Sequence, residues 1–445
     1  MPRPDEGISA LLTVYNILML LAAGIGWPIV LPMALLTEKR RKTMPYRLGI
    51  VPPPVGKRFS RDVCRRRPIW VHALSVGEVL SALPLLQALR QRYGRRRVLL
   101  SVSTLTGFEL ANSREPASAD AVFFSPYDIP HVVRRMTDSI DPALVVIVET
   151  DIWPNMVYHV HHRRIPLLLV NARLSPRTFA GYRRLRPIIG PTLNRFSKIC
   201  TQSESETDRF HRLGVAKSRL VVTGNVKFDQ PENPAAESQV TDLAEHLDIP
   251  EGAAVLVAGS THNGEETMLA DAFRGVRRNF PELRLVVVPR DPKRAVSVDR
   301  IFSAAGFSCR RLSDSDRQGT ETGTDVLIVD VIGLLRALYR ISRVSFVGGS
   351  LVARGGHNPL EPAACGKPIL FGPHMTDFPD IARKLKEGGG AMEVHTPADI
   401  QRAVTHLMST PERAGAMGRQ AYSIYRANQG AVAKTLNVIG HLLPP

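Results

Sequence analysis

The fold of this chain is constrained most by two series of short apolar runs. Each run is followed by a stretch with helical character. In the first half the runs cover residues 69–74, 98–102, 143–148, 167–170 and 198–200. The run at 143–148 is apolar throughout, as expected of a strand in a parallel sheet that is buried on both faces. Alternating strands and helices therefore predict an α/β fold with a parallel sheet.

A second series begins after a polar, Pro-rich stretch, DQPENPAAES at 229–238, which reads as a linker. Its strand candidates are residues 255–257, 285–288, 326–329, 344–347 and 368–371, and residues 410–443 look helical. A chain of 445 residues has room for two such domains. Because ligands of such sheets bind at the carboxyl ends of the strands, we expect a cleft site between the two domains.

The positive charge of the chain is concentrated in its first half. Residues 1–228 hold 34 Lys and Arg against 16 Asp and Glu, whereas the remainder holds 24 against 25. A single basic cluster is usually a solvated surface, but a bias over half the molecule indicates an anionic partner such as a membrane, an anionic lipid or nucleic acid. No basic groove interleaved with aromatic residues is evident, which disfavours nucleic acid.

The N-terminal segment predicts contact with a membrane. Residues 7–37 carry no charge and are followed at once by EKRRK at 38–42. A membrane span needs about 20 apolar residues, and the basic flank places the bulk of the protein in the cytoplasm. Pro28 and Pro32 interrupt a helix, so both a spanning segment and one lying in the interface from Trp27 onward remain open. A signal peptide cleaved near residues 22–24 is a rival interpretation.

Cysteine and histidine usage gives no sign of a metal site. The four cysteines are scattered and form no CxxC pair, which is typical of a reducing compartment. His159, His161 and His162 lack nearby carboxylate ligands, so we interpret them as not binding metal.

A glycine-rich segment in the second half is a candidate phosphate site. An apolar strand leads into Gly348, Gly349 and Ser350, and a second glycine pair at 355–356 precedes the sequence NPLE at 358–361. Glycines allow close approach of a ligand to the backbone, and a helix N-terminus attracts an anion. The alternative is that NPLE only caps a helix.

Four charged residues of the first half are candidates for chemistry, and the three carboxylates among them follow predicted strands. Glu78 could accept a proton from an acceptor hydroxyl, although Ser75 and Glu78 also match a capping box. Glu149 and Asp151 follow a buried strand, where they either act on a substrate or pair with local arginines. Lys227 lies just before the linker and could neutralise a leaving phosphate, although a single lysine is usually solvated.

Seven motifs, in order, resemble the 3-deoxy-D-manno-octulosonic acid (Kdo) transferase family of lipopolysaccharide biosynthesis. They are SVGE at 75–78, VETDIWPN at 148–155, NARLS at 171–175, TGNVKFD at 223–229, GSTHNGEE at 259–266, VPRDPKR at 288–294 and the glycine-rich block at 348–374. The resemblance implies a GT-B fold, in which two Rossmann-like domains face each other across a cleft. It also implies an inverting, metal-independent transfer of Kdo from CMP-Kdo to a lipid A precursor of the lipid IVA type, with no cofactor.

The resemblance assigns roles to individual residues. Glu78 is similar to the general base, and Glu149 and Lys227 to the groups that stabilise the transition state. The positions expected to hold the donor are Ser260, Thr261, Pro289, Arg290, Ile332, Gly333, Leu334, Gly348, Gly349, Ser350, Asn358, Pro359, Leu360 and Glu361. The chain departs from the family pattern at Asp291, Lys293 and Leu334, where the family usually has His, Glu and Glu, and at Asp151, where Glu is commoner.

The expected organisation has five parts. They are a membrane anchor with its basic flank (1–44), an acceptor-binding domain (45–228), the linker (229–238), a CMP-sugar-binding domain (239–410) and a C-terminal helical segment (411–445). The expected location is the cytoplasmic face of a bacterial inner membrane. Two alternatives remain: a GT-B transferase that uses a UDP-sugar donor, and a non-catalytic protein that binds anionic lipid.

Overall fold

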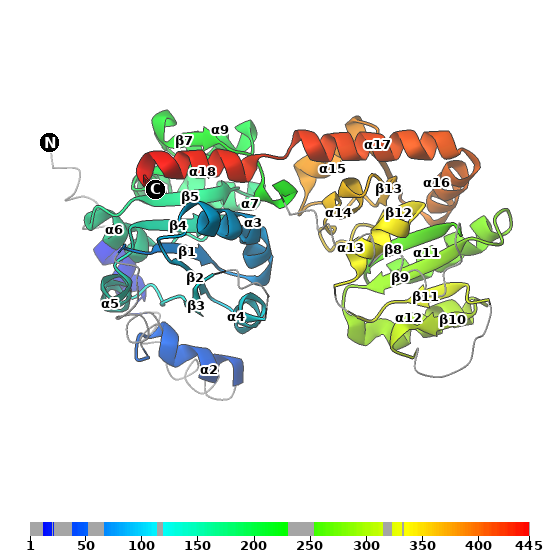
Figure 1. Ribbon diagram of the computed structural model, residues 1–445, viewed down its shortest axis with the longest axis horizontal. Coiled ribbons are helices and arrows are strands. Elements are labelled where there is room, and N and C mark those ends of the chain that lie inside the picture. Colours follow the sequence, from blue (N-terminus) through cyan, green and yellow to red (C-terminus); the bar gives the residue numbers. More distant parts are fainter. Residues whose placement is uncertain are drawn as a thin grey trace. The chain divides into compact units, whose positions relative to one another are not determined.

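The computed structural model describes residues 12–19, 21, 38–51, 66–113, 119–229, 253–314, 323–331 and 333–444. The chain forms two compact units, one of residues 1–231 with 429–445 and the other of residues 232–428. Each unit is built around one parallel sheet with helices on both of its faces (Figure 1). The prediction of two parallel α/β domains is confirmed.

The first sheet has the strand order β3-β2-β1-β4-β5-β6-β7. Its strands are β1 Ile69–Ala73, β2 Val98–Val102, β3 Ala121–Phe124, β4 Leu144–Val148, β5 Leu167–Ala172, β6 Lys198–Thr201 and β7 Leu220–Val222. The central strands β1, β2, β4 and β5 are buried at every position, which explains their largely apolar sequences. From β1 the next strands are added on one side of the sheet, and from β4 onward they are added on the other side. Ligands of open α/β sheets bind at this switch point between β1 and β4.

The helices of the first unit include the one that closes the chain. They are α2 Glu38–Arg47, α3 Val76–Arg92, α4 Leu105–Asn112, α5 Pro130–Ile140, α6 Pro154–His162, α7 Pro176–Arg184, α8 Arg186–Leu193, α9 Glu204–Arg212 and α18 Ala431–Leu442. Val432, Ile439 and Leu443 join the core beneath α3, and Asp229 accepts the backbone N–H groups of Gly430 and Val432 at 2.7 and 2.6 Å.

The second sheet has the order β10-β11-β9-β8-β12-β13-β14, with a switch point between β8 and β12. Its strands are β8 Val255–Thr261, β9 Arg284–Pro289, β10 Cys309–Arg311, β11 Val326–Ile328, β12 Val344–Val347, β13 Ile369–Phe371 and β14 Ala391–Glu393. Its helices are α11 Glu265–Arg277, α12 Ala295–Ala304, α13 Leu335–Ile341, α14 Leu360–Ala364, α15 Pro379–Glu387, α16 Pro397–Ser409 and α17 Pro411–Ala427.

The structure describes the expected C-terminal helical segment but only a small part of the expected N-terminal anchor. The segment at 411–445 is two helices that belong to different units, α17 to the second and α18 to the first. Among the described residues, no helix combines the length and the apolar character needed to cross a bilayer. Most of the proposed anchor at 7–37 and most of the linker at 229–238 lie outside the described residues.

Candidate active site

The predicted catalytic residues of the first unit lie at the carboxyl edge of its sheet. Glu78 is in the first turn of α3, directly after β1, and Glu149 directly follows β4. Because β1 and β4 are neighbours at the switch point, the topology brings these two carboxylates to one place. The charges of Glu149, Asp151 and Lys227 all act on Glu78.

Glu78 is held by the turn that precedes α3. Ser75 Oγ accepts the N–H of Glu78 at 3.5 Å, and the Glu78 carboxylate accepts the N–H of Leu74 at 2.5 Å. The Ser75–Glu78 capping box is therefore only half formed, because the carboxylate reaches one residue beyond the cap. Burial, together with the negative charges of Glu149 and Asp151, raises the pKa of Glu78 to about 8, although the Leu74 N–H and Lys227 lower it. A carboxyl group with this pKa can take up a proton near neutral pH.

Glu149 and Lys227 form an ion pair beside Glu78. Lys227 Nζ lies 3.3 Å from Glu149 Oε1, and about four-fifths of each side chain is buried. Glu149 has φ +62°, a conformation that costs energy for a residue with a side chain and that clusters at functional sites. The alternative partners expected from sequence were arginines, and the structure gives Glu149 a lysine instead.

Asn171 connects the sheet to the segment that carries Lys227. It is fully buried at the end of β5, has φ +55°, and its Oδ1 accepts the backbone N–H of Val226 at 3.2 Å. Its Nδ2 has no hydrogen-bond partner among the described residues. Asn171 belongs to the NARLS motif, but the sequence alone suggested no role for it.

His72 is a site residue that sequence reasoning missed. It is buried within β1, where Nε2 lies 2.7 Å from Asp151 Oδ2 and Nδ1 lies 2.8 Å from Ser101 Oγ. This pairing gives Asp151 a histidine partner, whereas the arginines were the partners that the sequence offered as one alternative. The one available signal was the polar histidine in the otherwise apolar strand sequence IWVHA.

In the second unit, the backbone N–H groups of the glycine-rich turn after β12, which the sequence predicts to face a phosphate, bind to other parts of the protein. The N–H of Gly348 donates to Gly259 O at 2.8 Å, and those of Gly349 and Ser350 donate to the Glu265 carboxylate at 2.7 and 3.0 Å. A Cβ on Gly348 would lie 2.4 Å from Ser260 O, so this glycine is required for packing between β8 and β12. The amide groups of this turn are already bound by the protein itself.

Glu265 organises that turn and was also missed. Its side chain is fully buried and accepts four backbone N–H groups, those of His262, Gly349, Ser350 and Leu351, at distances between 2.7 and 3.0 Å. Burial raises the pKa of Glu265, whereas these hydrogen bonds lower it. The signal was its place in GSTHNGEE, directly after the neighbouring strand.

A cluster of charged and aromatic groups lies beside this turn. The rings of His262 and His357 stack with an angle of 7° between their planes, and their Nε2 atoms are 2.8 Å from each other. Burial, with the positive charges of Arg290 and His262, lowers the pKa of His357 to about 4. Burial raises the pKa of Glu361, against the charges of Arg336 and Arg290 and a hydrogen bond from Asn358. The charge of Arg290, a residue expected to hold the donor, thus acts on both His357 and Glu361.

The helix expected at NPLE is short and begins one residue late. Pro359 is the N-cap of α14, which starts at Leu360 and has five residues, and Asn358 Oδ1 accepts the N–H of Leu360 at 3.1 Å. Because this helix has only five residues, its dipole is weak, and the expectation that an anion binds at its N-terminus loses support.

The remaining predicted donor residues lie at the carboxyl edge of the second sheet or beside α13. Ser260 (φ +58°) and Thr261 end β8, and the Oγ1 of Thr261 is buried without a hydrogen-bond partner among the described residues. Pro289 ends β9, and Gly333 and Leu334 precede α13. Ile332 lies outside the described residues.

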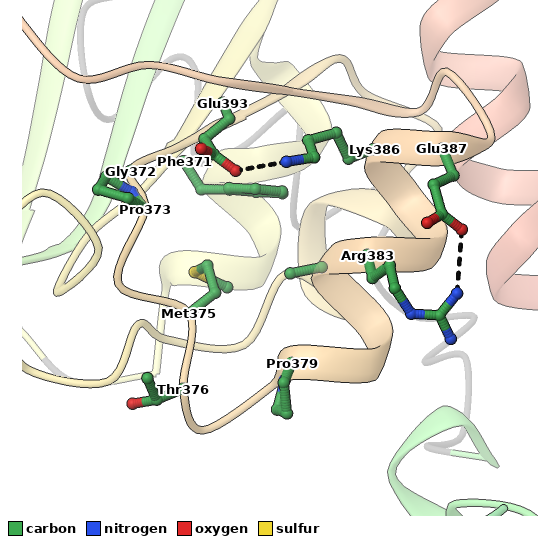
Figure 2. Close-up of a pocket in the computed structure, with 11 residues that line it drawn as sticks. Phe371, Gly372, Pro373, Met375, Thr376, Pro379, Arg383, Lys386, Glu387 and Glu393 are labelled. Carbon is green, nitrogen blue, oxygen red and sulfur yellow. Dashed lines mark hydrogen bonds and ion pairs between the residues drawn. The ribbon is translucent and has the colours of Figure 1, made fainter. Parts of the chain in front are cut away.

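The second unit also contains a pocket that lies away from the predicted site residues. The described ranges contain no group of three or more His, Cys, Asp or Glu placed to hold a metal. Figure 2 shows a pocket of about 450 Å³ between the end of β13 and α15, rimmed by the Lys386–Glu393 and Arg383–Glu387 ion pairs. None of the predicted site residues lines it.

Sequence comparison with known proteins identifies the family. A family model described as 3-deoxy-D-manno-octulosonic-acid transferase (kdotransferase) matches residues 42–230. A 3-deoxy-D-manno-octulosonic acid transferase of Haemophilus influenzae is 34% identical over 393 residues, which are 87% of each chain. This chain belongs to the Kdo transferase family. A Kdo transferase of Chlamydophila psittaci is 29% identical over 91% of this chain and 90% of its own.

Comparison with solved structures concerns the fold alone. The crystal structure of UDP-GlcNAc 2-epimerase from Neisseria meningitidis bound to UDP-GlcNAc matches 84% of this chain and 99% of its own chain, with a TM-score of 0.60 at 13% identity. A glycosyltransferase from Rickettsia africae matches 85% and 99%, with a TM-score of 0.59 at 12% identity. The two-unit architecture is thus shared with proteins of unrelated sequence.

Proposed function

We propose that the chain is an inverting, metal-independent glycosyltransferase of the GT-B type that needs no cofactor and moves Kdo from CMP-Kdo to a lipid A precursor of the lipid IVA type. Its membership of the Kdo transferase family supports transfer of Kdo in lipopolysaccharide biosynthesis. The two parallel-sheet α/β units support the GT-B assignment.

The observation that carries the mechanism is a proton-accepting carboxylate beside an ion pair. Glu78, whose pKa is raised to about 8, is the proposed general base, next to Glu149 and Lys227. The acceptor hydroxyl gives its proton to Glu78 while its oxygen bonds to the anomeric carbon of Kdo. The bond from that carbon to the phosphate oxygen breaks, and its electron pair leaves with CMP. A positioned base contributes about 10²–10⁴-fold to such a reaction.

The ion pair can serve both ends of this displacement. The Glu149 carboxylate would stabilise positive charge on the sugar ring, and the Lys227 ammonium would neutralise the leaving phosphate. Because each already neutralises the other at 3.3 Å, the pair is oriented before the substrate arrives. In the second unit, we assign the anionic parts of the donor to Arg290 and its uncharged polar groups to Asn358 and Glu361.

The first unit suits a membrane-bound, anionic acceptor. Its excess of Lys and Arg matches an acceptor that carries phosphates, and the uncharged segment at 7–37 suits an anchor to the cytoplasmic face of the inner membrane. From the family resemblance we assign binding of the CMP-Kdo donor to the second unit. We propose no nucleic-acid partner.

A donor screen tests this proposal. The purified full-length protein is incubated with a tetraacylated disaccharide bisphosphate and either CMP-Kdo or UDP-N-acetylglucosamine, and the product is analysed by mass spectrometry. Growth of the acceptor by Kdo residues with CMP-Kdo alone is the expected result. Turnover with the UDP-sugar alone would favour the alternative transferase, and binding of the acceptor without turnover would favour a lipid-binding protein.

A further inference from the structure

A buried row of polar side chains crosses the first sheet and ends at the candidate site. Trp70 and His72 lie on the same face of β1, since residues two apart on a strand share a face. Ser101 of β2 is the register partner of His72, and β4 pairs with the other side of β1 (Figure 1). Trp70, His72 and Ser101 are each 0% exposed. A buried polar group costs free energy unless it is hydrogen-bonded, so three of them in one sheet call for an explanation.

The hydrogen bonds along this row have a defined direction. Trp70 Nε1 can only donate, and it donates to Ser101 Oγ at 2.8 Å. His72 Nδ1 lies 2.8 Å from the same oxygen, and His72 Nε2 lies 2.7 Å from Asp151 Oδ2. A carboxylate only accepts, so Nε2 of His72 carries the hydrogen that it donates to Asp151. The Ser101 hydroxyl donates to Nδ1 when the ring is neutral and accepts from it when the ring is charged.

The inner end of the row is anchored in the apolar core. Trp70 packs against Phe123, with ring centroids 6.0 Å apart, in a cluster that also includes Leu99. At the outer end, Asp151 lies just after β4, at the carboxyl edge that carries Glu78, and its side chain is 11% exposed. A core tryptophan thus holds, through two hydrogen-bonded side chains, a carboxylate at the edge of the candidate site.

The charge of Asp151 acts on groups from three helices. Burial raises the pKa values of Glu78 on α3 and Tyr182 on α7, and the charge of Asp151 adds to both effects. Burial lowers the pKa of Arg47 on α2, and the charge of Asp151 opposes this effect. A carboxylate that is free to rotate would vary these influences, whereas one held at 2.7 Å keeps its charge in one place.

We propose that His72 is a positioning residue for the transfer reaction: backed by Ser101, it holds the carboxylate of Asp151 at the sheet edge that carries the general base, Glu78. The inference rests on the proposed function, because Glu78 is a base only in a transferase. A base is most effective when the charges around it are fixed before the substrate arrives. The competing explanation is that His72 is a buried histidine that only completes the packing of the sheet.

Two replacements of His72 in the purified full-length protein separate these explanations. The amide nitrogen of Gln lies near the place of Nε2 and can still donate to Asp151, whereas that of Asn lies near Nδ1 and reaches only Ser101. His72→Asn should lower the high-pH plateau of kcat roughly tenfold and move the midpoint of kcat/KM to lower pH, since a buried Asp151 without its donor favours the neutral form and no longer raises the pKa of Glu78. His72→Gln should keep the wild-type midpoint. The exposed His131→Asn on α5 is the control and should match the wild type. Equal midpoints for His72→Asn and the wild type would overturn the proposal.

A double-substitution cycle tests whether His72 acts through Asp151. Asp151→Asn should lower the midpoint as His72→Asn does, and the double variant should match Asp151→Asn alone. Additive shifts would mean that His72 acts independently of Asp151 and would refute the positioning role.

NMR of the wild-type protein with ¹⁵N-labelled histidine gives a readout that does not depend on an altered fold. We expect the signal that is absent from His72→Gln to be that of a ring with a hydrogen on Nε2. A neutral ring with its hydrogen on Nδ1 contradicts the contact with Asp151. If the wild-type protein transfers no Kdo, the proposed function fails. If it transfers Kdo and the His72 variants match it, only this inference fails.

Discussion

At the residue scale, the charge of Glu78 depends on its neighbours. Burial and the carboxylates of Glu149 and Asp151 favour the protonated form, while Lys227 and the Leu74 N–H favour the ionised form. A base works only when ionised, so the rate of transfer should report this balance.

We predict that kcat/KM rises with pH and is half-maximal near pH 8, because the pKa of Glu78 is raised to about 8. Glu149→Gln should move the midpoint to lower pH, since it removes a charge that raises the pKa, and Lys227→Ala should move it to higher pH. The midpoint of the profile is the measurement, since the height of the plateau also reflects other roles of these residues. A profile that is flat between pH 6.5 and 9 contradicts the assignment.

Asn171 is predicted to position Lys227. Asn171→Ala should lower kcat about tenfold, the effect of losing one hydrogen bond of about 1.4 kcal/mol, and should raise the pH midpoint as Lys227→Ala does. Asn171→Gly is the matched variant, because glycine adopts φ +55° without strain. If Asn171→Gly keeps full activity, only the backbone conformation matters and the positioning role is refuted.

At the element scale, the strands that sequence predicts are those at the centre of each sheet. Largely apolar runs identify β1, β2, β4, β5, β8 and β9, because strands that are buried on both faces hold few polar residues. The four strands not predicted, β3, β7, β10 and β14, are the outermost strands of the two sheets. Edge strands such as β10 (CRR) have partly exposed side chains, so their sequences carry no apolar run.

The candidate site, too, could be predicted from the sequence only in part. Glu78 and Glu149 could be placed together because each directly follows a predicted strand, whereas Lys227 was placed only by its position just before the linker. The partners Asn171, His72 and Glu265 could not, since their contacts join segments far apart in sequence. Gly348 shows a related limit, because a close approach of backbone to backbone, which it makes with Ser260, and a close approach of backbone to phosphate require the same residue.

The turn after β12 should depend on Glu265. Glu265→Gln replaces one accepting oxygen by an NH₂ group that faces a backbone N–H, which costs about 1–3 kcal/mol. We expect the KM for CMP-Kdo to rise about tenfold, with a smaller change in kcat and a lower Tm. Glu282→Gln, an exposed position with the same change of charge, is the control. If neither KM nor Tm changes, Glu265 does not organise the turn.

At the scale of the whole molecule, the chain returns to its first unit after completing the second. Val432, Ile439 and Leu443 complete the core under α3, and Tyr93 Oη donates to Leu443 O at 2.8 Å. The first unit is thus not a continuous segment, and residues 1–231 alone lack part of their core.

Deletion of residues 429–445 should therefore destabilise the first unit selectively. Loss of three buried aliphatic side chains at about 1.5–3 kcal/mol each approaches the whole stability of a domain. In hydrogen exchange we expect β1–β7 to lose protection while β8–β14 keep theirs. Equal loss in both sheets, or none, would contradict the division of the chain into these units.

The role of Glu78 as the general base is tested most directly by the transfer rate of the intact enzyme with Glu78 replaced by Gln. Glutamine can still accept the Leu74 N–H but cannot take up a proton, so we predict a fall in kcat of about 10²–10⁴-fold with CMP-Kdo and a tetraacylated acceptor. Glu109→Gln, an exposed position on α4, should retain full activity. Wild-type rates from Glu78→Gln would show that this carboxylate is not the base.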